Sequence, residues 1–265
     1  MKDTKIDITL PSRSLVTNKG DAGKVLVIGS DIGMAGASYF SAEAAYRCGA
    51  GLVEISSHPE NRMVFQTLIP EAIFSDWSTA KINADAIVLG VGLGRSDFAS
   101  RLTERVLTLK KAFTVVDADA LNIMAENKDL LNLLSPDTVV TPHIKEMSRL
   151  TGLEVEYILE NPEKVALEFS KKYNTNVVLK NKVTYVALAD GDIYENREGS
   201  SALSKGGSGD ILTGVIASLV AQGVKVKEAI VYGVYIHSLA GRVAGEKLGE
   251  RRVLARDILN ELTLQ

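Results

Sequence analysis

The stretch KGGSGDILTG, residues 205–214, concentrates residues whose types and spacing suit chemistry. Its glycines allow backbone conformations that bring main-chain N–H groups close to a ligand. We expect a helix to begin near Gly209, so that its unpaired amides and positive end bind an anion such as phosphate. Within that cradle, Asp210 predicts a base that takes a proton from a hydroxyl about to accept a phosphoryl group. The alternative is that Asp210 caps the first turn, a role worth about 1 kcal/mol.

Three other side chains have types that suit an anion or metal site. His143 follows Pro142 in TPHIKE, and its ring could donate to a phosphate or a ribose; the alternative is a loop histidine with partners of its own. Lys180 ends an apolar run and could neutralise phosphate charge, unless it is solvated. Glu146 could hold Mg²⁺ through water, since that ion keeps much of its hydration shell; a surface acid is equally compatible.

Four further residues are of types that often bind metals or take part in catalysis, but their sequence context favours structural roles. Asp117 and Asp119 in DADALN resemble metal ligands, but Asp119 is equally explained as a helix cap, so neither is predicted to bind metal. Cys48, the single cysteine, is expected to be buried and unreactive, which fits a reducing compartment. His237 is expected to be a packed helix histidine.

Short apolar runs alternate with helical patterns along the chain. Strands are predicted within residues 24–31, 51–57, 84–94, 112–122, 137–143 and 175–181, and a hairpin within 183–196 that turns at Asp190 and Gly191. Helices are predicted within residues 36–51, 97–111, 144–152, 209–222 and 227–247. This order predicts a single α/β domain with a mostly parallel sheet, helices on both faces and candidate site residues after the strands.

Composition excludes several classes of partner. The chain has 265 residues, 46% hydrophobic, with a net charge of −3, so no general positive field gathers nucleic acid or an anionic membrane. No apolar run approaches the roughly 20 residues of a membrane span, and the start MKDTKIDITL is too charged for a signal peptide. We therefore expect a cytoplasmic protein.

The glycine-rich stretch and its continuation, GGSGD followed by ILTGVIASLVAQG, resemble the signature of the ribokinase-like superfamily. Six more segments resemble, in order, those of ADP/ATP-dependent NAD(P)H-hydrate dehydratases: NKGDAGKVLVIGSD, GMAGASYFSAEAAYRCGAGLVEI, VLGVGLGR, VVDADALN, TPHIKEMSRLTG and VVLKNKVTYVA. The resemblance runs from about residue 18 to the end. It implies a ribokinase-like three-layer sandwich.

The resemblance also implies an activity. Members of this family repair hydrated NADH and NADPH (NADHX and NADPHX): the nucleotide phosphorylates the ring hydroxyl and phosphate is then eliminated. Bacterial members generally use ADP and eukaryotic ones ATP, and the family suggests a homo-oligomer, often a tetramer. Because the chain begins shortly before the dehydratase pattern, we expect no epimerase domain. The apolar helix within residues 227–247 is a candidate for an oligomer interface or for the core.

Site residues carry over position by position from the family. Asp210 matches the catalytic base and a contact to the hydrated nicotinamide, and Gly207, Ser208 and Gly209 match the anion hole. Ala37, Gly94 and His143 match contacts to the hydrated dinucleotide. The nucleotide-binding positions are Lys180, Asn181, Lys182, Val183, Thr184 and Gly209.

Some positions depart from the family pattern. Asn18 replaces the histidine of HKGD, Asn181 replaces the glycine of KGA, and the stretch before the glycine loop lacks the usual asparagine and proline. These departures concern nucleotide choice and affinity. Two alternatives stay open: a small-molecule hydroxyl kinase of the same superfamily, of the hydroxymethylpyrimidine or hydroxyethylthiazole type, and a non-catalytic nucleotide sensor. A carboxylate beside phosphate argues against the sensor, because it would weaken binding.

Overall fold

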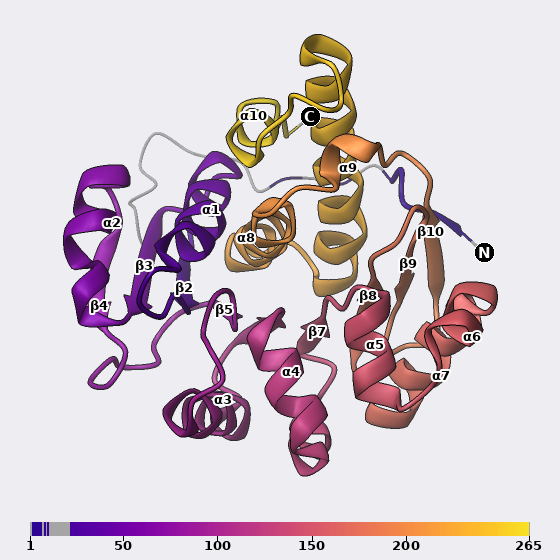
Figure 1. The fold of residues 1–265 in the computed structure, drawn as a ribbon, viewed down its shortest axis with the longest axis horizontal. Coiled ribbons are helices and arrows are strands. Elements are labelled where there is room, and N and C mark those ends of the chain that lie inside the picture. Colours follow the sequence, from indigo (N-terminus) through magenta and orange to yellow (C-terminus); the bar gives the residue numbers. More distant parts are fainter. Residues whose placement is uncertain (1, 7, 9, 11–21, 265) are drawn as a thin grey trace.

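The computed structural model describes every residue except 1, 7, 9, 11–21 and 265, so Asn18 lies outside the described residues. Its described strands form one ten-stranded sheet with the order β1-β10-β9-β8-β7-β6-β5-β2-β3-β4 (Figure 1). The parallel body comprises β2 (Lys24–Ile28), β3 (Leu52–Ser57), β4 (Ile73–Asp76), β5 (Ala86–Leu89), β6 (Phe113–Val116), β7 (Thr138–Val140) and β8 (Asn176–Leu179). The predicted mostly parallel sheet is confirmed.

An antiparallel hairpin extends the sheet beyond β8. It consists of β9 (Thr184–Ala187) and β10 (Ile193–Asn196), with short β1 (Lys2–Asp3) parallel to β10 at the edge. Gly191 occupies the turn with φ of 90°, a backbone conformation that suits glycine. The hairpin predicted for residues 183–196 is therefore confirmed.

Helices cover both faces of the sheet, as predicted. On one face lie α1 (Ala35–Arg47), α8 (Ser208–Ala221) and α9 (Val226–Leu248); on the other lie α3 (Asp97–Leu109), α4 (Asp119–Glu126), α5 (Ile144–Thr151), α6 (Val155–Glu160) and α7 (Pro162–Tyr173) (Figure 1). The shorter α2 (Arg62–Leu68) packs beside β4 and α1, and α10 (Ala255–Asn260) packs on α9 and α1. The described 3₁₀ helices are η1 (Pro59–Asn61), η2 (Lys128–Leu133) and η3 (Ser201–Leu203).

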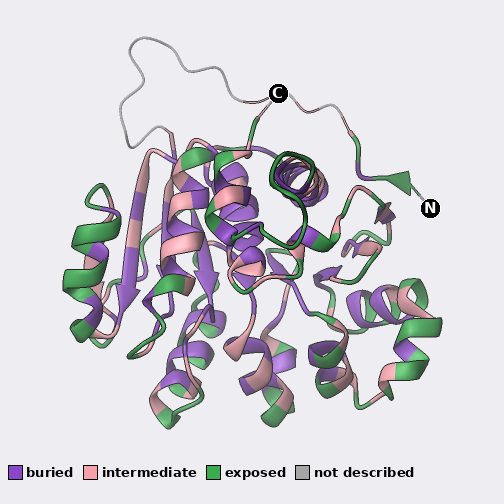
Figure 2. Ribbon diagram, turned by 45° about the horizontal axis from the view of Figure 1, so that its top comes forward, coloured by how far each residue is buried: buried purple, intermediate pink, exposed green. Residues whose placement is uncertain are grey.

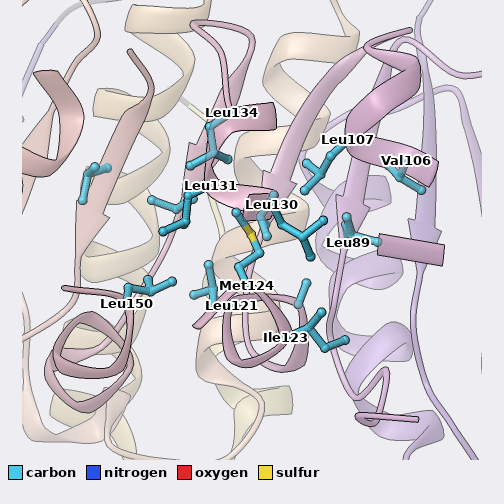
Figure 3. Close-up of a cluster of buried hydrophobic side chains, with 14 of the residues drawn as sticks. Leu89, Val106, Leu107, Leu121, Ile123, Met124, Leu130, Leu131, Leu134 and Leu150 are labelled. Atoms are coloured by element: carbon cyan, nitrogen blue, oxygen red, sulfur yellow. The ribbon is translucent and has the colours of Figure 1, made fainter. Parts of the chain in front are cut away.

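Alternation along β2 builds a core on each side of the sheet. Leu26 and Ile28 point into one cluster with α3 and α4, while Val25 and Val27 join the other with α1 and α8. Figure 3 shows the first cluster, in which Met124 lies among leucines of α4 and η2. Strands buried on both faces are purple along their length in Figure 2, and the outer helix surfaces are green. This burial explains the continuous apolar runs in the sequence.

Helix α8 is enclosed, which fixes the loop in front of it. It packs against α1, α9 and strands β2, β5 and β6. Gly214 lets α1 and α8 approach, because a Cβ there would lie 2.0 Å from the Ser41 carbonyl oxygen. Most apolar positions of α9 are likewise buried within the chain, so this helix serves mainly the core, while Leu248 in its last turn is exposed. No described helix is long and apolar enough to cross a membrane.

Candidate active site

Loops after β6, β7 and β8 and the start of α8 line one cavity of about 990 Å³. Because parallel strands end at the same edge of the sheet, the residues that follow them are brought together there. The cavity lining includes carboxylates, lysines and histidines, among them Asp117, Glu146, Asp210, Lys180, His143 and His237. Residues far apart in the chain therefore share one polar chamber.

The glycine loop and the first turn of α8, residues 207–210, line this cavity with main-chain N–H groups. Helix α8 begins at Ser208 after Gly207, whose φ of 94° places it in the left-handed region. The N–H of Ser208 donates to the Lys205 carbonyl at 3.2 Å, whereas the N–H groups of Gly209 and Asp210 have no acceptor among the described residues. Two unpaired donors at a helix N-terminus favour an anion. Ser208 still has its hydroxyl to offer a ligand.

Asp210 lies in the lining with its carboxylate free of hydrogen bonds to any described residue. It therefore does not act as the helix cap that was the alternative. Burial raises the pKa of Asp210 to about 7, with the Asp117 charge adding to the effect and Lys180 opposing it. Its main chain is fixed, since the carbonyl accepts from Ser41 Oγ at 3.0 Å and Thr213 Oγ1 at 2.7 Å. A carboxyl group poised near neutrality suits a general base.

Lys180 is paired rather than solvated. Its Nζ lies 2.8 Å and 3.1 Å from the two carboxylate oxygens of Asp117, and its side chain is 23% exposed against 4% for Asp117. The pKa of Lys180 is raised: burial works to lower it, but the charges of Asp117 and Glu146 prevail. A Cβ on Gly209 would lie 3.3 Å from Lys180 Nζ, so the ion pair sits against the glycine loop. The lysine is thus positioned to reach an anion bound there.

His143 and Glu146 form a reciprocal cap at the start of α5. His143 Nδ1 accepts from the Glu146 N–H at 3.1 Å, and Glu146 Oε2 accepts from the His143 N–H at 2.8 Å. Because Nδ1 accepts, the neutral His143 ring carries its proton on Nε2. The His143 side chain is 49% exposed. Burial, and then Lys180, lower the pKa of His143. His143 therefore has an internal hydrogen-bond partner at Nδ1, lines the cavity, and has its Nε2 3.6 Å from Glu146 Oε1.

Glu146 is a buried acid, so the alternative of a surface position is wrong. Its side chain is 7% exposed, and burial raises the pKa of Glu146 to about 7 against the opposing charge of Lys180. Together with Asp117, Asp210 and Glu250 it gives the cavity four carboxylates. Among the residues with described placement, no three His, Cys, Asp or Glu side chains are close enough to ligate one metal ion directly.

Of the predicted dinucleotide contacts, Ala37 lies in the first turn of α1 and Gly94 lies in the loop after β5, and both are outside the cavity lining. A Cβ on Gly92 would lie 3.1 Å from Ala37 Cβ, so the loop after β5 packs against the start of α1. The Gly94 N–H donates to Asp119 Oδ2 at 2.9 Å, and the charge of Asp119 raises the pKa of Asp210. Asp119 is the first residue of α4 and braces the Gly94 loop, so its explanation as a helix cap is wrong.

The predicted nucleotide segment reaches the cavity at most of its positions. Lys180, Asn181, Lys182 and Thr184 belong to the lining, together with Gly209, whereas Val183 does not. Residues 199–201 and 203–205, just before the glycine loop, also line the cavity, and no pattern in that stretch predicts it. His237 is buried as predicted, but it also touches Ser208, a contact that the helical pattern does not reveal. Cys48 is buried, and burial raises the pKa of its thiol to about 12, so it is unreactive as predicted.

Solved structures with the same architecture define the class of fold. A ribokinase-like superfamily protein of Enterococcus faecalis is 27% identical, with a TM-score of 0.83 over 96% of this chain and 89% of that one. The ADP/ATP-dependent NAD(P)H-hydrate dehydratase of Bacillus subtilis, co-crystallised with ATP and Mg²⁺, is also 27% identical, with a TM-score of 0.83 over 96% and 92% of the two chains. The predicted ribokinase-like fold is confirmed.

Sequence comparisons identify the family. The family model described as NAD(P)H-hydrate dehydratase matches residues 25–264. An ADP-dependent (S)-NAD(P)H-hydrate dehydratase of Staphylococcus aureus is 32% identical over 90% of this chain and 87% of that protein. The chain belongs to the NAD(P)H-hydrate dehydratase family. It spans about half the length of other curated relatives: the bifunctional NAD(P)H-hydrate repair enzyme of Coxiella burnetii, 38% identical, is matched over 96% of this chain and 52% of its own length.

Proposed function

We propose that the chain dehydrates the S-epimers of hydrated NADH and NADPH, restoring the dihydronicotinamide and converting ADP to AMP and phosphate. Family membership supports this reaction. The observation that carries it is the carboxylate of Asp210, whose pKa burial raises to about 7, beside N–H groups at the start of α8; none of these groups has a hydrogen-bond partner among the described residues. A base and an anion site in one cavity are what phosphoryl transfer to an alcohol requires.

The proposed reaction has two steps. Asp210 takes the proton of the ring hydroxyl while that oxygen attacks the terminal phosphorus of ADP, and AMP leaves. The carbon–oxygen bond to the new phosphate group then breaks, and the neighbouring ring carbon loses a proton so that the double bond forms. Three donors stabilise the charge on the transferring group: the N–H groups of Gly209 and Asp210 and the hydroxyl of Ser208. The left-handed backbone conformation of Gly207 allows the loop to present these donors.

Binding roles follow from position and from the family. The adenine nucleotide is held by Gly209 and by the segment Lys180, Asn181, Lys182, Val183 and Thr184, with the Lys180 ammonium neutralising phosphate charge. The hydrated dinucleotide contacts Ala37, Gly94, His143 and Asp210. The Gly94 N–H is bound to Asp119, whose charge adds to the burial that raises the pKa of Asp210, and this proximity supports binding of one end of the dinucleotide near the base. His143 Nε2–H is a donor for its phosphate or ribose oxygens.

The donors in the cavity fit Mg²⁺ held through water. Glu146 and Asp117 are buried carboxylates, and the charge of Asp117 adds to the burial that raises the pKa of Glu146, so a cation between the two would relieve that repulsion. Mg²⁺ keeps most of its water and needs few carboxylates when phosphates are present. When bound, the ion would neutralise the phosphate charge of the nucleotide. Glu146→Gln should then raise the Mg²⁺ concentration for half-maximal turnover, whereas Glu126→Gln, an exposed acid, should not.

The assembly and location follow the family expectation: a homotetramer in the cytoplasm. Because most apolar positions of α9 pack inside the chain, we expect the interface to use mainly other surfaces. Light scattering on the purified protein tests the tetramer.

A ³¹P NMR time course with hydrated NADH, ADP and Mg²⁺ distinguishes the dehydratase from the kinase alternative. A dehydratase releases AMP and inorganic phosphate in equal amounts, and the dihydronicotinamide absorbance returns. A kinase of the hydroxymethylpyrimidine or hydroxyethylthiazole type would leave hydrated NADH unchanged and would accumulate a stable phosphate ester only when given its own alcohol and a nucleotide. The kinase alternative is not favoured by the comparisons: a hydroxyethylthiazole kinase of Pyrococcus horikoshii is 18% identical with a TM-score of 0.65, a likeness of fold alone.

A further inference from the structure

His237 lies on α9 directly against the first residue of α8. Its Nε2 is 2.9 Å from the Ser208 carbonyl oxygen and 3.2 Å from Ser208 Oγ, and the ring is 6% exposed. The two residues are distant in sequence, so only the packing of α9 against α8 brings them together. Because His237 Nε2 makes polar contacts with Ser208, the ring does more than fill space in the core.

The two contacts fix which ring nitrogen carries a proton. Burial lowers the pKa of His237 to about 4, so the ring is neutral near pH 7 and has one N–H. A carbonyl oxygen only accepts hydrogen bonds, so the nitrogen facing it, Nε2, must be the donor. Nε2 therefore cannot accept a hydrogen bond from the Ser208 hydroxyl. The hydroxyl proton must be donated elsewhere.

The Ser208 hydroxyl can donate its proton to a ligand in the cavity. Ser208 belongs to the lining, and its Oγ has no other partner among the described residues. The neighbouring N–H groups of Gly209 and Asp210 are also unpaired. A phosphate oxygen bound at those amides would be the acceptor that the Ser208 hydroxyl lacks.

We propose that His237 is a positioning residue: by donating Nε2–H to the Ser208 carbonyl, it holds Ser208 so that its hydroxyl donates to the transferring phosphoryl group. This inference rests on the proposed function and deepens it. His237 acts through Ser208. Its loss should lower kcat, since the donor is needed most where negative charge develops, and leave the KM of the hydrated dinucleotide nearly unchanged.

A double-mutant cycle tests this coupling. His237→Leu should lower kcat about tenfold, and His237→Gln, whose amide can still donate, should stay within about threefold of the wild type. In a Ser208→Ala background, His237→Leu should cost less than about twofold further. A tenfold loss in that background would overturn the inference, because His237 would then act independently of Ser208. Ile236→Ala, on the same helix but in the apolar cluster, is the matched control for general destabilisation and should leave kcat unchanged.

Two readouts remain informative if the dehydratase activity itself is absent. In ¹⁵N NMR of histidine-labelled protein, His237 should show a neutral ring protonated on Nε2 from pH 6 to 8; a proton on Nδ1 or a charged ring would overturn the inference. ADP affinity by calorimetry should fall in both single variants without further loss in the double variant. Wild-type protein that binds ADP but does not repair hydrated NADH would contradict the proposed function alone. Additive losses of ADP affinity would contradict the role of His237.

Discussion

Lys180 Nζ lies 2.8 Å from Asp117 Oδ1, and this ion pair rests against Gly209 at the start of α8. Because both partners are largely buried, their charges act on the rest of the cavity with little screening by water. Lys180 lowers the pKa of Asp210, while Asp117 raises it. The pair therefore helps to set the pH at which the candidate base loses its proton.

Lys180→Met should move the acid limb of the pH profile. With the wild type, kcat/KM should rise with pH and level off above about 7, as Asp210 ionises. Without the ammonium group, the carboxyl keeps its proton longer, so the midpoint should shift upward by about one pH unit. Lys182→Met is the control, because Lys182 lines the same cavity without acting on the pKa of Asp210. An unchanged midpoint in Lys180→Met would contradict the electrostatic coupling.

Asp210→Asn should stabilise the protein, but only when the wild-type carboxyl is ionised. The pKa of Asp210 is about 7 in the folded protein, against about 3.9 in an unfolded chain, so wild-type stability falls as pH rises between these values. Urea unfolding should show a gain of about 1–3 kcal/mol at pH 8 that vanishes near pH 4. Asp129→Asn, an exposed acid, should change little at either pH. A gain of equal size at both pH values would contradict the assigned pKa.

Gly207→Ala should destabilise the fold. Its φ of 94° is strained for alanine, and a Cβ would lie 2.7 Å from the Phe40 ring and 2.9 Å from Ala255 Cβ. We expect a loss of about 1–3 kcal/mol in thermal or urea unfolding. Gly206→Ala is the matched control: a Cβ there meets nothing within 4 Å, so its stability should change by less than about 0.5 kcal/mol. Equal losses in the two variants would show that the loop does not have this conformation.

The sequence predicts the central strands because parallel strands buried on both faces are continuous apolar runs, as in β2 and β5. It does not predict β4, which has no fully buried residue and therefore lacks such a run. It does not predict α2, where Phe65 is the one buried residue and Met63 is 70% exposed, so the apolar residues do not mark a buried face. Helix α7 is also missed, although Pro162 at its first turn and apolar residues at Val165 and Phe169 are signals that would locate it.

The sequence predicts the site residues that belong to a local motif, but it does not predict which distant residues contact one another in the site. Asp210 and its glycines are marked by local sequence, because one loop and one helix start create the anion site. The Lys180–Asp117 pair joins residues that are 63 positions apart, and it depends on β6, β7 and β8 being neighbours in the sheet. Burial of Glu146 and the contact of His237 with Ser208 likewise depend on how helices dock. No local pattern encodes these distances.

The most direct test of the account compares Asp210→Asn with the wild type in turnover of hydrated NADH and in ADP affinity. The wild type should regenerate NADH when supplied with ADP and Mg²⁺. The variant should lose about 10²–10⁴-fold in kcat, the contribution of a general base, while its ADP affinity is retained or improved because a charge next to phosphate is gone. Turnover by the variant at the wild-type rate would contradict the assignment of Asp210 as the base.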